Sequence, residues 1–170
     1  MTPLVKYVCQ QRTCQRLAAC PGKRYPLILM LDVPEHMDDP IEALRHALDL
    51  LVPEGIVIVT VPAFMALWTN HDVLNHHLVR YTKQSFRKIA LQSGLLIQEE
   101  RCLYHWICPV KLGLRFVETV FQTKARAPQV PAGWANEVFF RVSRLEQRLL
   151  STFLIPFGSS LTVVGGKGKT

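Results

Sequence analysis

The alternation of apolar and polar residues becomes regular from Tyr25 onward. Leu27 to Leu31 form a short continuous apolar run, which is typical of a strand buried on both faces of a sheet. Ile56 to Val61 form a second run of the same kind. Two such strands predict a sheet that carries helices on both sides.

A helix is predicted between these two strands. Asp39 is suited to cap it, Pro40 to fill its first position and Glu42 to complete a capping box, while Pro53-Glu54-Gly55 is expected to end it. In between, apolar residues recur at helical spacing at Ile41, Leu44, Leu48 and Leu51. The strand, helix and strand together predict a parallel crossover unit.

The second half of the chain predicts more helix than strand. Thr82 is suited to cap a helix and Gly94 to stop it. The other predicted elements are a strand over Leu95–Glu99, amphipathic helices over Pro109–Thr123 and Trp134–Phe153, and a last strand over Leu161–Val164. We expect the apolar faces of the two long helices to pack on the sheet. The tryptophans are expected to anchor the core or the helices, at Trp68, Trp106 and Trp134.

The first 24 residues form a basic segment without a clean period. A short strand is predicted within Leu4–Cys9 and a turn or two of helix within Thr13–Cys20. The pattern therefore predicts one main domain over residues 25–170, with a helical insertion at about 109–153.

Composition narrows the class of protein further. The chain has 170 residues, nearly half of them hydrophobic, as in an ordinary soluble α/β or α+β domain. Five basic residues precede the first acidic one, Asp32, but such short basic ends are usually just solvated, so nucleic-acid binding is not expected. The apolar stretch from Ile56 to Trp68 is interrupted by Pro62 and falls short of the ~20 residues of a membrane-spanning helix. Five cysteines without a signal peptide indicate reduced thiols in the cytoplasm.

Residues able to carry chemistry follow the two predicted strands. Asp32-Val33-Pro34-Glu35-His36 comes after the first strand, and Pro62 to Tyr81 comes after the second. In open α/β sheets the carboxyl ends of the strands border the ligand crevice. These two segments are therefore expected to line a common site.

The order and spacing of these segments resemble one family. The motif pieces are Leu31-Asp32-Val33-x-Glu35-His36-x-Asp38-Asp39-Pro40, Pro53-x-Gly55, Val61-Pro62-Ala63, Leu67-Trp68, His71-Asp72, His77-x-x-Arg80-Tyr81 and Pro156-Phe157-Gly158-x-Ser160. Together they resemble the class I S-adenosylmethionine-dependent methyltransferases, and more narrowly the type 11 or type 12-like members. Three positions depart from the family pattern, at Pro34, Glu54 and Val79.

The resemblance implies part of a Rossmann-like three-layer sandwich. This chain would supply strands four to seven of a seven-stranded sheet, mostly parallel, with an antiparallel last strand between the fifth and the sixth. Family members hold the cofactor mainly through a glycine-rich turn after their first strand and an acidic residue that ends their second. Gly22 is the only glycine before Asp32, and no acidic residue precedes Asp32. We therefore expect a partial methyltransferase domain, from a short protein or a truncated gene, that binds S-adenosylmethionine weakly or not at all.

The resemblance also implies roles for individual residues. Cofactor contacts fall on Asp32, Val33 and Glu35, and contacts to a small-molecule or glycan-type acceptor fall on His71, Asp72, Arg80 and Tyr81. His36 and His77 are the expected catalytic residues. His36 would accept a proton from the attacking hydroxyl or amine, because a neutral imidazole titrates near the operating pH. The alternatives for these side chains are ordinary hydrogen bonding to nearby backbone and, for Arg80 and Tyr81, an exposed pair before a helix cap.

Two other functions remain open at this stage. His71, Asp72, His76 and His77 invite a metal site or a metal hydrolase, but loop histidines without regular ligand spacing more often form a polar surface, so no metal is expected. A chain without the first strands would expose Leu27–Leu31 as a sheet edge. That edge would suit a non-catalytic module that pairs with another chain or with itself.

Overall fold

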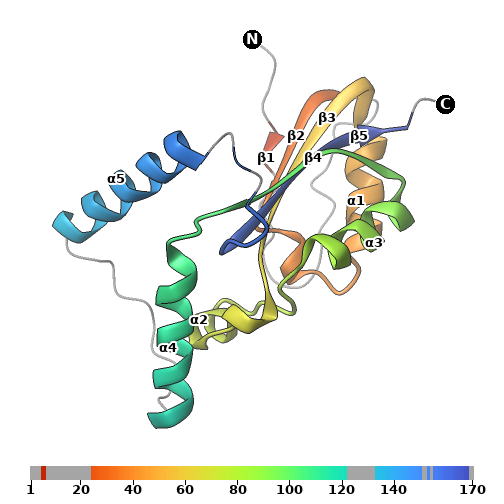
Figure 1. The fold of residues 1–170 in the computed structure, drawn as a ribbon. Coiled ribbons are helices and arrows are strands. Elements are labelled where there is room, and N and C mark those ends of the chain that lie inside the picture. The colour runs from red at the N-terminus through yellow and green to blue at the C-terminus, as the bar shows by residue number, and fades with distance from the viewer. Residues whose placement is uncertain (1–4, 7–23, 122–132, 151–152, 154, 169–170) are drawn as a thin grey trace.

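The computed structural model describes residues 5–6, 24–121, 133–150, 153 and 155–168. A mixed five-stranded sheet forms its centre, in the order β1-β2-β3-β5-β4 (Figure 1). The strands are β1 (Val5–Lys6), β2 (Tyr25–Leu31), β3 (Leu51–Pro62), β4 (Leu95–Leu103) and β5 (Ser160–Lys167). The helices are α1 (Pro40–Asp49), α2 (Asn70–Leu74), α3 (Lys83–Ser93), α4 (Ile107–Phe121) and α5 (Gly133–Leu150), with 3-10 turns at Pro34–His36 and Met65–Leu67.

The predicted crossover unit is confirmed. β2 and β3 pair in parallel, and α1 connects them. The Asp39 carboxylate caps α1 by accepting hydrogen bonds from the amides of Ile41 at 3.0 Å and Glu42 at 2.9 Å. The predicted cap and stop of α3 are also confirmed, because Thr82 accepts from the Ser85 amide and Gly94 adopts a left-handed φ of 82°.

The boundary between α1 and β3 differs from the prediction. The helix ends at Asp49, and Leu51 already pairs with Tyr25, so Pro53-Glu54-Gly55 lies within the strand. The pairing shifts register between Tyr25 and Leu27, and Glu54 adopts a left-handed φ of 62°. A bulge of this kind accommodates extra residues without ending the pairing, which is why a turn-forming sequence lies inside a strand.

The last strand lies inside the sheet rather than at its edge. β5 pairs antiparallel with β3 on one side and antiparallel with β4 on the other. Gly165 of β5 allows the close approach to β4, because a Cβ at this position would lie only 2.4 Å from the Leu96 carbonyl oxygen. The sheet is therefore mixed. By pairing with both neighbours, β5 connects the parallel strands of the crossover unit to β4.

The core lies between the sheet and the layer formed by α1 and α3. Alternate residues of the central strands point into it and are fully buried, at Ile28, Val57, Val59, Val61, Leu161 and Val163. Leu44 of α1 and Phe86 of α3 meet them from the helical layer and are also fully buried. On the opposite face of the sheet, Ile56, Ile58 and Val164 are only half-buried. No described helix packs across that face, so the described residues form two layers of the three that the sequence predicted.

The edge of the sheet next to β2 is occupied. Val5 and Lys6 of β1 pair in parallel with Ile28 and Leu29. The expectation that Leu27–Leu31 forms an exposed edge is therefore wrong for the middle of this strand, and the proposed self-pairing loses its basis there. The second half of the predicted strand in Leu4–Cys9 and the predicted helical turns in Thr13–Cys20 lie outside the described residues.

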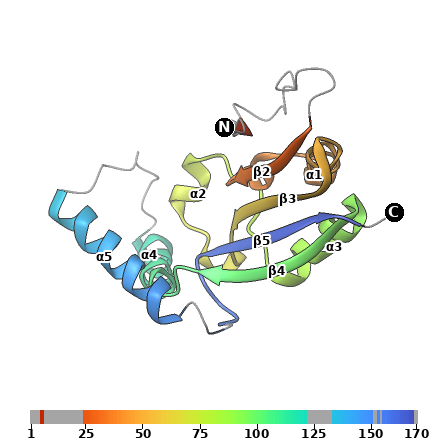
Figure 2. The same ribbon diagram turned by 90° about the horizontal axis from the view of Figure 1, so that it is seen from above.

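The expectation that the long helices pack on the sheet is wrong. α4 and α5 extend away from one end of the sheet, on the side opposite α1 and α3 (Figure 2), and their apolar side chains stay exposed, including Phe116 and Phe140. Glu146 tethers α5 by accepting a hydrogen bond from the His105 amide at 2.7 Å. Trp106 Nε1 adds a second tie by donating to Ser143 Oγ, whereas Trp134 is 75% exposed and is not part of the described core. No helix in the described part of the chain is long and apolar enough to span a membrane.

Candidate functional site

A cavity of about 380 Å³ opens at the carboxyl ends of β2 and β3. The two segments predicted to share a site both reach it, and so does the amino end of β5, which is antiparallel to its neighbours. Its lining consists almost entirely of polar and charged side chains: Asp32, Glu35, His36, Pro62, His71, Asn75, His77, Arg80, Lys111, Ser159 and Ser160.

The turn after β2 is held in place by the neighbouring strand. Asp32 adopts a left-handed φ of 52°, and its amide donates to Thr60 of β3, both to the carbonyl at 3.0 Å and to Oγ1 at 3.1 Å. The Asp32 carboxylate accepts a hydrogen bond from Thr60 Oγ1 at 3.3 Å and is exposed at the cavity wall. Val33 instead points into the hydrophobic core and does not line the cavity. The 3-10 turn Pro34–His36 then places Glu35 and His36 in the lining.

The loop after β3 is organised around Asp72, which is fully buried. Its carboxylate accepts from the Thr69 amide at 2.9 Å, from Arg80 Nε at 2.8 Å and from Arg80 Nη2 at 3.1 Å. His77 Nδ1 lies 2.8 Å from Asp72 Oδ1. Burial alone would raise the pKa of Asp72, but the hydrogen bonds from His77, Thr69 and Arg80 hold it well below its usual range. The carboxylate is therefore ionised and orients two cavity residues.

Arg80 is buried rather than exposed. Besides the two hydrogen bonds to Asp72, its Nη1 donates to the carbonyl of Ala63 at 3.0 Å. Only 3% of the residue is accessible, yet it forms part of the cavity wall. The expected alternative of an exposed Arg-Tyr pair is therefore wrong.

Glu35 is the least satisfied polar residue of the site. Its side chain is fully buried, and neither carboxylate oxygen has a hydrogen-bond partner among the described residues. Burial, reinforced by the nearby charges of Asp32 and Asp72, raises the pKa of Glu35 to about 8. Its backbone is well held, because its carbonyl accepts from the Leu78 amide at 2.7 Å. That bond joins the turn after β2 to the loop after β3.

His36 and His77 meet edge to face, with ring centroids 4.8 Å apart and an interplanar angle of 75°. Burial and the neighbouring His77 lower the pKa of His36, so its imidazole is neutral at neutral pH. The Asp72 carboxylate can only accept a hydrogen bond, so His77 donates from Nδ1. The two predicted catalytic residues are thus brought together at the cavity.

Several cavity residues were not singled out in the sequence. Lys111 reaches the cavity from α4, and burial together with Arg80 lowers its pKa. The side-chain amide nitrogen of Asn75 lies 2.8 Å from His71 Nε2. Ser159 follows Gly158, where an added Cβ would lie 2.5 Å from the Leu103 carbonyl oxygen. For Ser159, the only signal in the sequence was the neighbouring Gly158-x-Ser160 piece of the motif. For Lys111 there was none, because the amphipathic pattern of α4 does not distinguish it as a cavity residue.

Tyr81 supports the site from behind. It is buried and does not line the cavity. Its hydroxyl donates to the Pro34 carbonyl at 3.3 Å, and burial with the nearby Glu35 raises the pKa of Tyr81 to about 12. It therefore holds the turn after β2 against the loop after β3.

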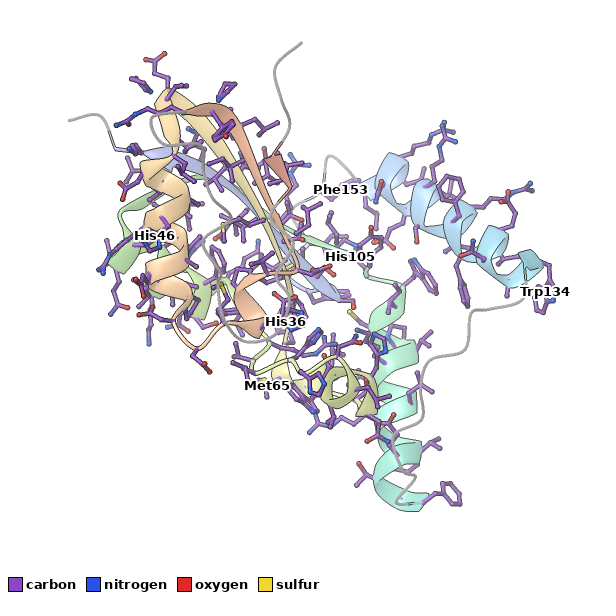
Figure 3. The ribbon with its side chains drawn as sticks, turned by 180° about the vertical axis from the view of Figure 1, so that it is seen from behind. His36, His46, Met65, His105, Trp134 and Phe153 are labelled. Carbon is purple, nitrogen blue, oxygen red and sulfur yellow. The ribbon has the colours of Figure 1, made fainter. Side chains whose placement is uncertain are left out.

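The structure brings most of the predicted site residues to one place. Asp32, Glu35, His36, His71, His77 and Arg80 line the cavity, while Val33, Asp72 and Tyr81 lie behind its wall. His36 lies at this end of the sheet, and His46 lies on α1 (Figure 3). His71, Asp72, His76 and His77, the group considered for a metal, do not converge as ligands in the described structure. The group of possible ligands that does converge is Glu35, His36 and His77.

Residues 5–100 match the family described as methyltransferase domain. A similar solved structure is a chain from the complex between the Haloferax volcanii Trm112 methyltransferase activator and a candidate methyltransferase, at 16% identity and a TM-score of 0.48, covering 87% of this chain and 56% of that one. Another is the [4+2]-cyclase SpnF, at 14% identity and a TM-score of 0.47, covering 87% and 52%. A third is Haemonchus contortus phosphoethanolamine N-methyltransferase 2 with S-adenosyl-L-methionine, at 14% identity and a TM-score of 0.46, covering 85% and 34%.

The chain thus spans about half the length of the first two of these structures. No protein of curated function matches it in sequence.

Proposed function

Because the chain belongs to the class I S-adenosylmethionine-dependent methyltransferases, we propose that its cavity is the acceptor side of a methyl-transfer site. The observation that carries this proposal is the convergence of the Asp32–His36 turn and the His71–Arg80 loop on one polar cavity. The acceptor proposed is a small molecule or a glycan-type hydroxyl compound. A polar cavity of about 380 Å³ suits a compound of that size and polarity.

The cofactor is proposed to lie against the turn after β2. Asp32 offers an exposed carboxylate there, beside the buried Glu35 and Val33. We propose that four strands of this chain correspond to strands four to seven of the family's sheet, in the order β2, β3, β4 and β5. The segment before Asp32 contains neither an acidic residue nor a glycine other than Gly22. We therefore expect this chain alone to bind S-adenosylmethionine weakly, because the contacts of a glycine-rich turn are missing.

The chemistry assigned to the residues is an in-line displacement. A hydroxyl or amine of the acceptor attacks the methyl carbon, the bond from carbon to sulfur breaks, and S-adenosylhomocysteine leaves. The proton of the attacking group passes to His36, whose lowered pKa keeps its imidazole neutral and able to accept it. Alignment of the two reactants supplies most of the remaining acceleration.

His77 and Arg80 are proposed to position the acceptor. Asp72 fixes both side chains, through His77 Nδ1 and through two nitrogens of Arg80. His71 and Lys111 lie on the same wall and supply further polar contacts. Tyr81, proposed from the sequence as a substrate contact, is better assigned to holding the turn that carries Glu35, because its hydroxyl is bonded to Pro34.

The proposal is tested by following labelled methyl groups. The full chain is incubated with millimolar methyl-labelled S-adenosylmethionine and a panel of phenols, amines and sugars, and products are detected by mass spectrometry. We expect slow transfer to at least one acceptor, and a rate at least about 100-fold lower in His36→Ala. His46→Ala, an exposed histidine on α1, is the matched control and should keep the full rate. Transfer to none of the acceptors, or equal rates in His36→Ala and the unchanged chain, would refute the proposal.

A further inference from the structure

Glu35 needs a partner that the described part of the chain does not supply. Its side chain is fully buried and both oxygens are without a hydrogen bond. His36 Nε2 lies 4.0 Å from Oε1, beyond hydrogen-bonding distance. Buried polar groups in native proteins are nearly always paired, and an unpaired one is costly to retain. An unpaired carboxyl group at a cavity wall therefore makes Glu35 a candidate for contact with a ligand.

Two imidazoles stand beside this carboxylate. One ligand atom each from Glu35, His36 and His77 lies within 4.8 Å of the others. His77 is already oriented as a ligand, because Asp72 accepts a 2.8 Å hydrogen bond from Nδ1 and leaves Nε2 as the ring nitrogen available to an ion. A carboxylate bonded to the far nitrogen is the usual outer-sphere support of a metal-bound histidine.

From this cluster we propose that Glu35, His36 and His77 bind a divalent transition-metal ion of the zinc or cobalt kind. Two imidazole nitrogens and one carboxylate oxygen form a ligand set that such ions accept, and one that leaves a coordination position open. That open position would face the cavity, which all three residues line.

The geometry requires only a small closure. At a metal–nitrogen distance of about 2.1 Å, tetrahedral ligand atoms stand about 3.4 Å apart, compared with separations of up to 4.8 Å here. His36 is only half-buried and can rotate toward the other two ligands. The positive charge of Arg80 is offset by its two hydrogen bonds to Asp72, so this buried pair adds little net charge beside the ion.

This inference goes beyond the proposed methyl transfer and does not depend on it. A nitrogen whose lone pair binds a cation cannot accept a proton, so the proton-accepting role of His36 belongs to the ion-free protein. Metal binding is measured without cofactor or acceptor. Failure of the ion to bind and failure of methyl transfer are therefore distinct results.

The test uses untagged full-length chain, treated with EDTA and titrated with Co²⁺ under reducing conditions. Cobalt is chosen because its absorption spectrum distinguishes nitrogen and oxygen ligands from thiolates, and the chain contains five cysteines. We expect one ion per chain, visible d–d bands and no near-ultraviolet thiolate band. Glu35→Gln, which keeps the shape of the side chain, and His36→Ala, which changes a half-buried residue, should each weaken binding at least about 10-fold.

His46→Ala on α1 is the matched control, because it removes an exposed imidazole outside the cavity. Its affinity should equal that of the unchanged chain. No bound cobalt, a thiolate spectrum, or an affinity unaltered by both Glu35→Gln and His36→Ala would each overturn the proposal.

Discussion

Asp72 and Arg80 form a buried, two-pronged ion pair, with Nε 2.8 Å from Oδ1 and Nη2 3.1 Å from Oδ2. Both side chains are almost completely inaccessible, at 0% for Asp72 and 1% for Arg80. The pair ties α2 to the segment before α3, and the same carboxylate fixes His77. The shape of the cavity wall therefore depends on a contact that lies behind it.

Arg80→Ala is expected to destabilise the chain by about 3–5 kcal/mol, because it leaves the buried Asp72 carboxylate without its main partner. Urea denaturation followed by circular dichroism measures the loss. Arg141→Ala provides the control, since Arg141 pairs with Glu137 on the exposed surface of α5, and such a pair contributes less than about 1 kcal/mol. Equal effects of the two substitutions would show that the Asp72–Arg80 pair does not hold the loop.

Gly158→Ala is expected to destabilise the chain by about 1–3 kcal/mol, the usual cost of inserting a carbon into a tightly packed site. The new Cβ would lie 2.5 Å from the Leu103 carbonyl oxygen, and a backbone atom cannot easily move away. Gly113→Ala on α4 is a matched glycine substitution, because no atom lies within 4 Å of the added carbon. It should stabilise the helix by about 1 kcal/mol. Thermal unfolding distinguishes the two; a neutral Gly158→Ala would contradict the close packing next to Ser159.

Tyr81 provides a prediction at high pH. Its pKa of about 12 in the folded chain lies above its ordinary value of 10, so the folded state favours the protonated phenol. The corresponding stability is fully present below pH 10 and is lost as the pH rises from 10 through 12. The unfolding free energy of the unchanged chain should therefore fall, relative to that of Tyr81→Phe, across this interval. Parallel curves for the two proteins would show that the Tyr81 phenol titrates like an exposed one.

The local elements of the fold could be predicted because their signals are local. Apolar runs marked β2 and β3, and Asp39, Thr82 and Gly94 marked the ends of helices through their own hydrogen bonds or backbone angles. The bulge at Glu54 could not be predicted, because a proline and glycine beside it suggest a turn unless the partner strand is known. The amphipathic patterns of α4 and α5 likewise revealed an apolar face without revealing whether the sheet would cover it.

The candidate site could be predicted only in part. The position of polar residues after two parallel strands was enough to expect Asp32, Glu35, His36, His71, His77 and Arg80 in one place. The contacts among them were not predictable: Glu35 has no hydrogen-bond partner among the described residues and stands beside His77, which is remote in sequence. Lys111 reaches the cavity from α4, and the amphipathic pattern of that helix does not indicate its direction relative to the sheet.

The most direct test of the methyl-transfer account is an amide NMR titration of the full chain with S-adenosylmethionine up to millimolar concentration. The account predicts fast-exchange shifts centred on residues 32–36 and on Thr60 to Ala63, with weak affinity that falls further in Asp32→Ala. Shifts confined to other parts of the described structure, such as the outer faces of α1 and α5, or no shifts at all, would contradict it.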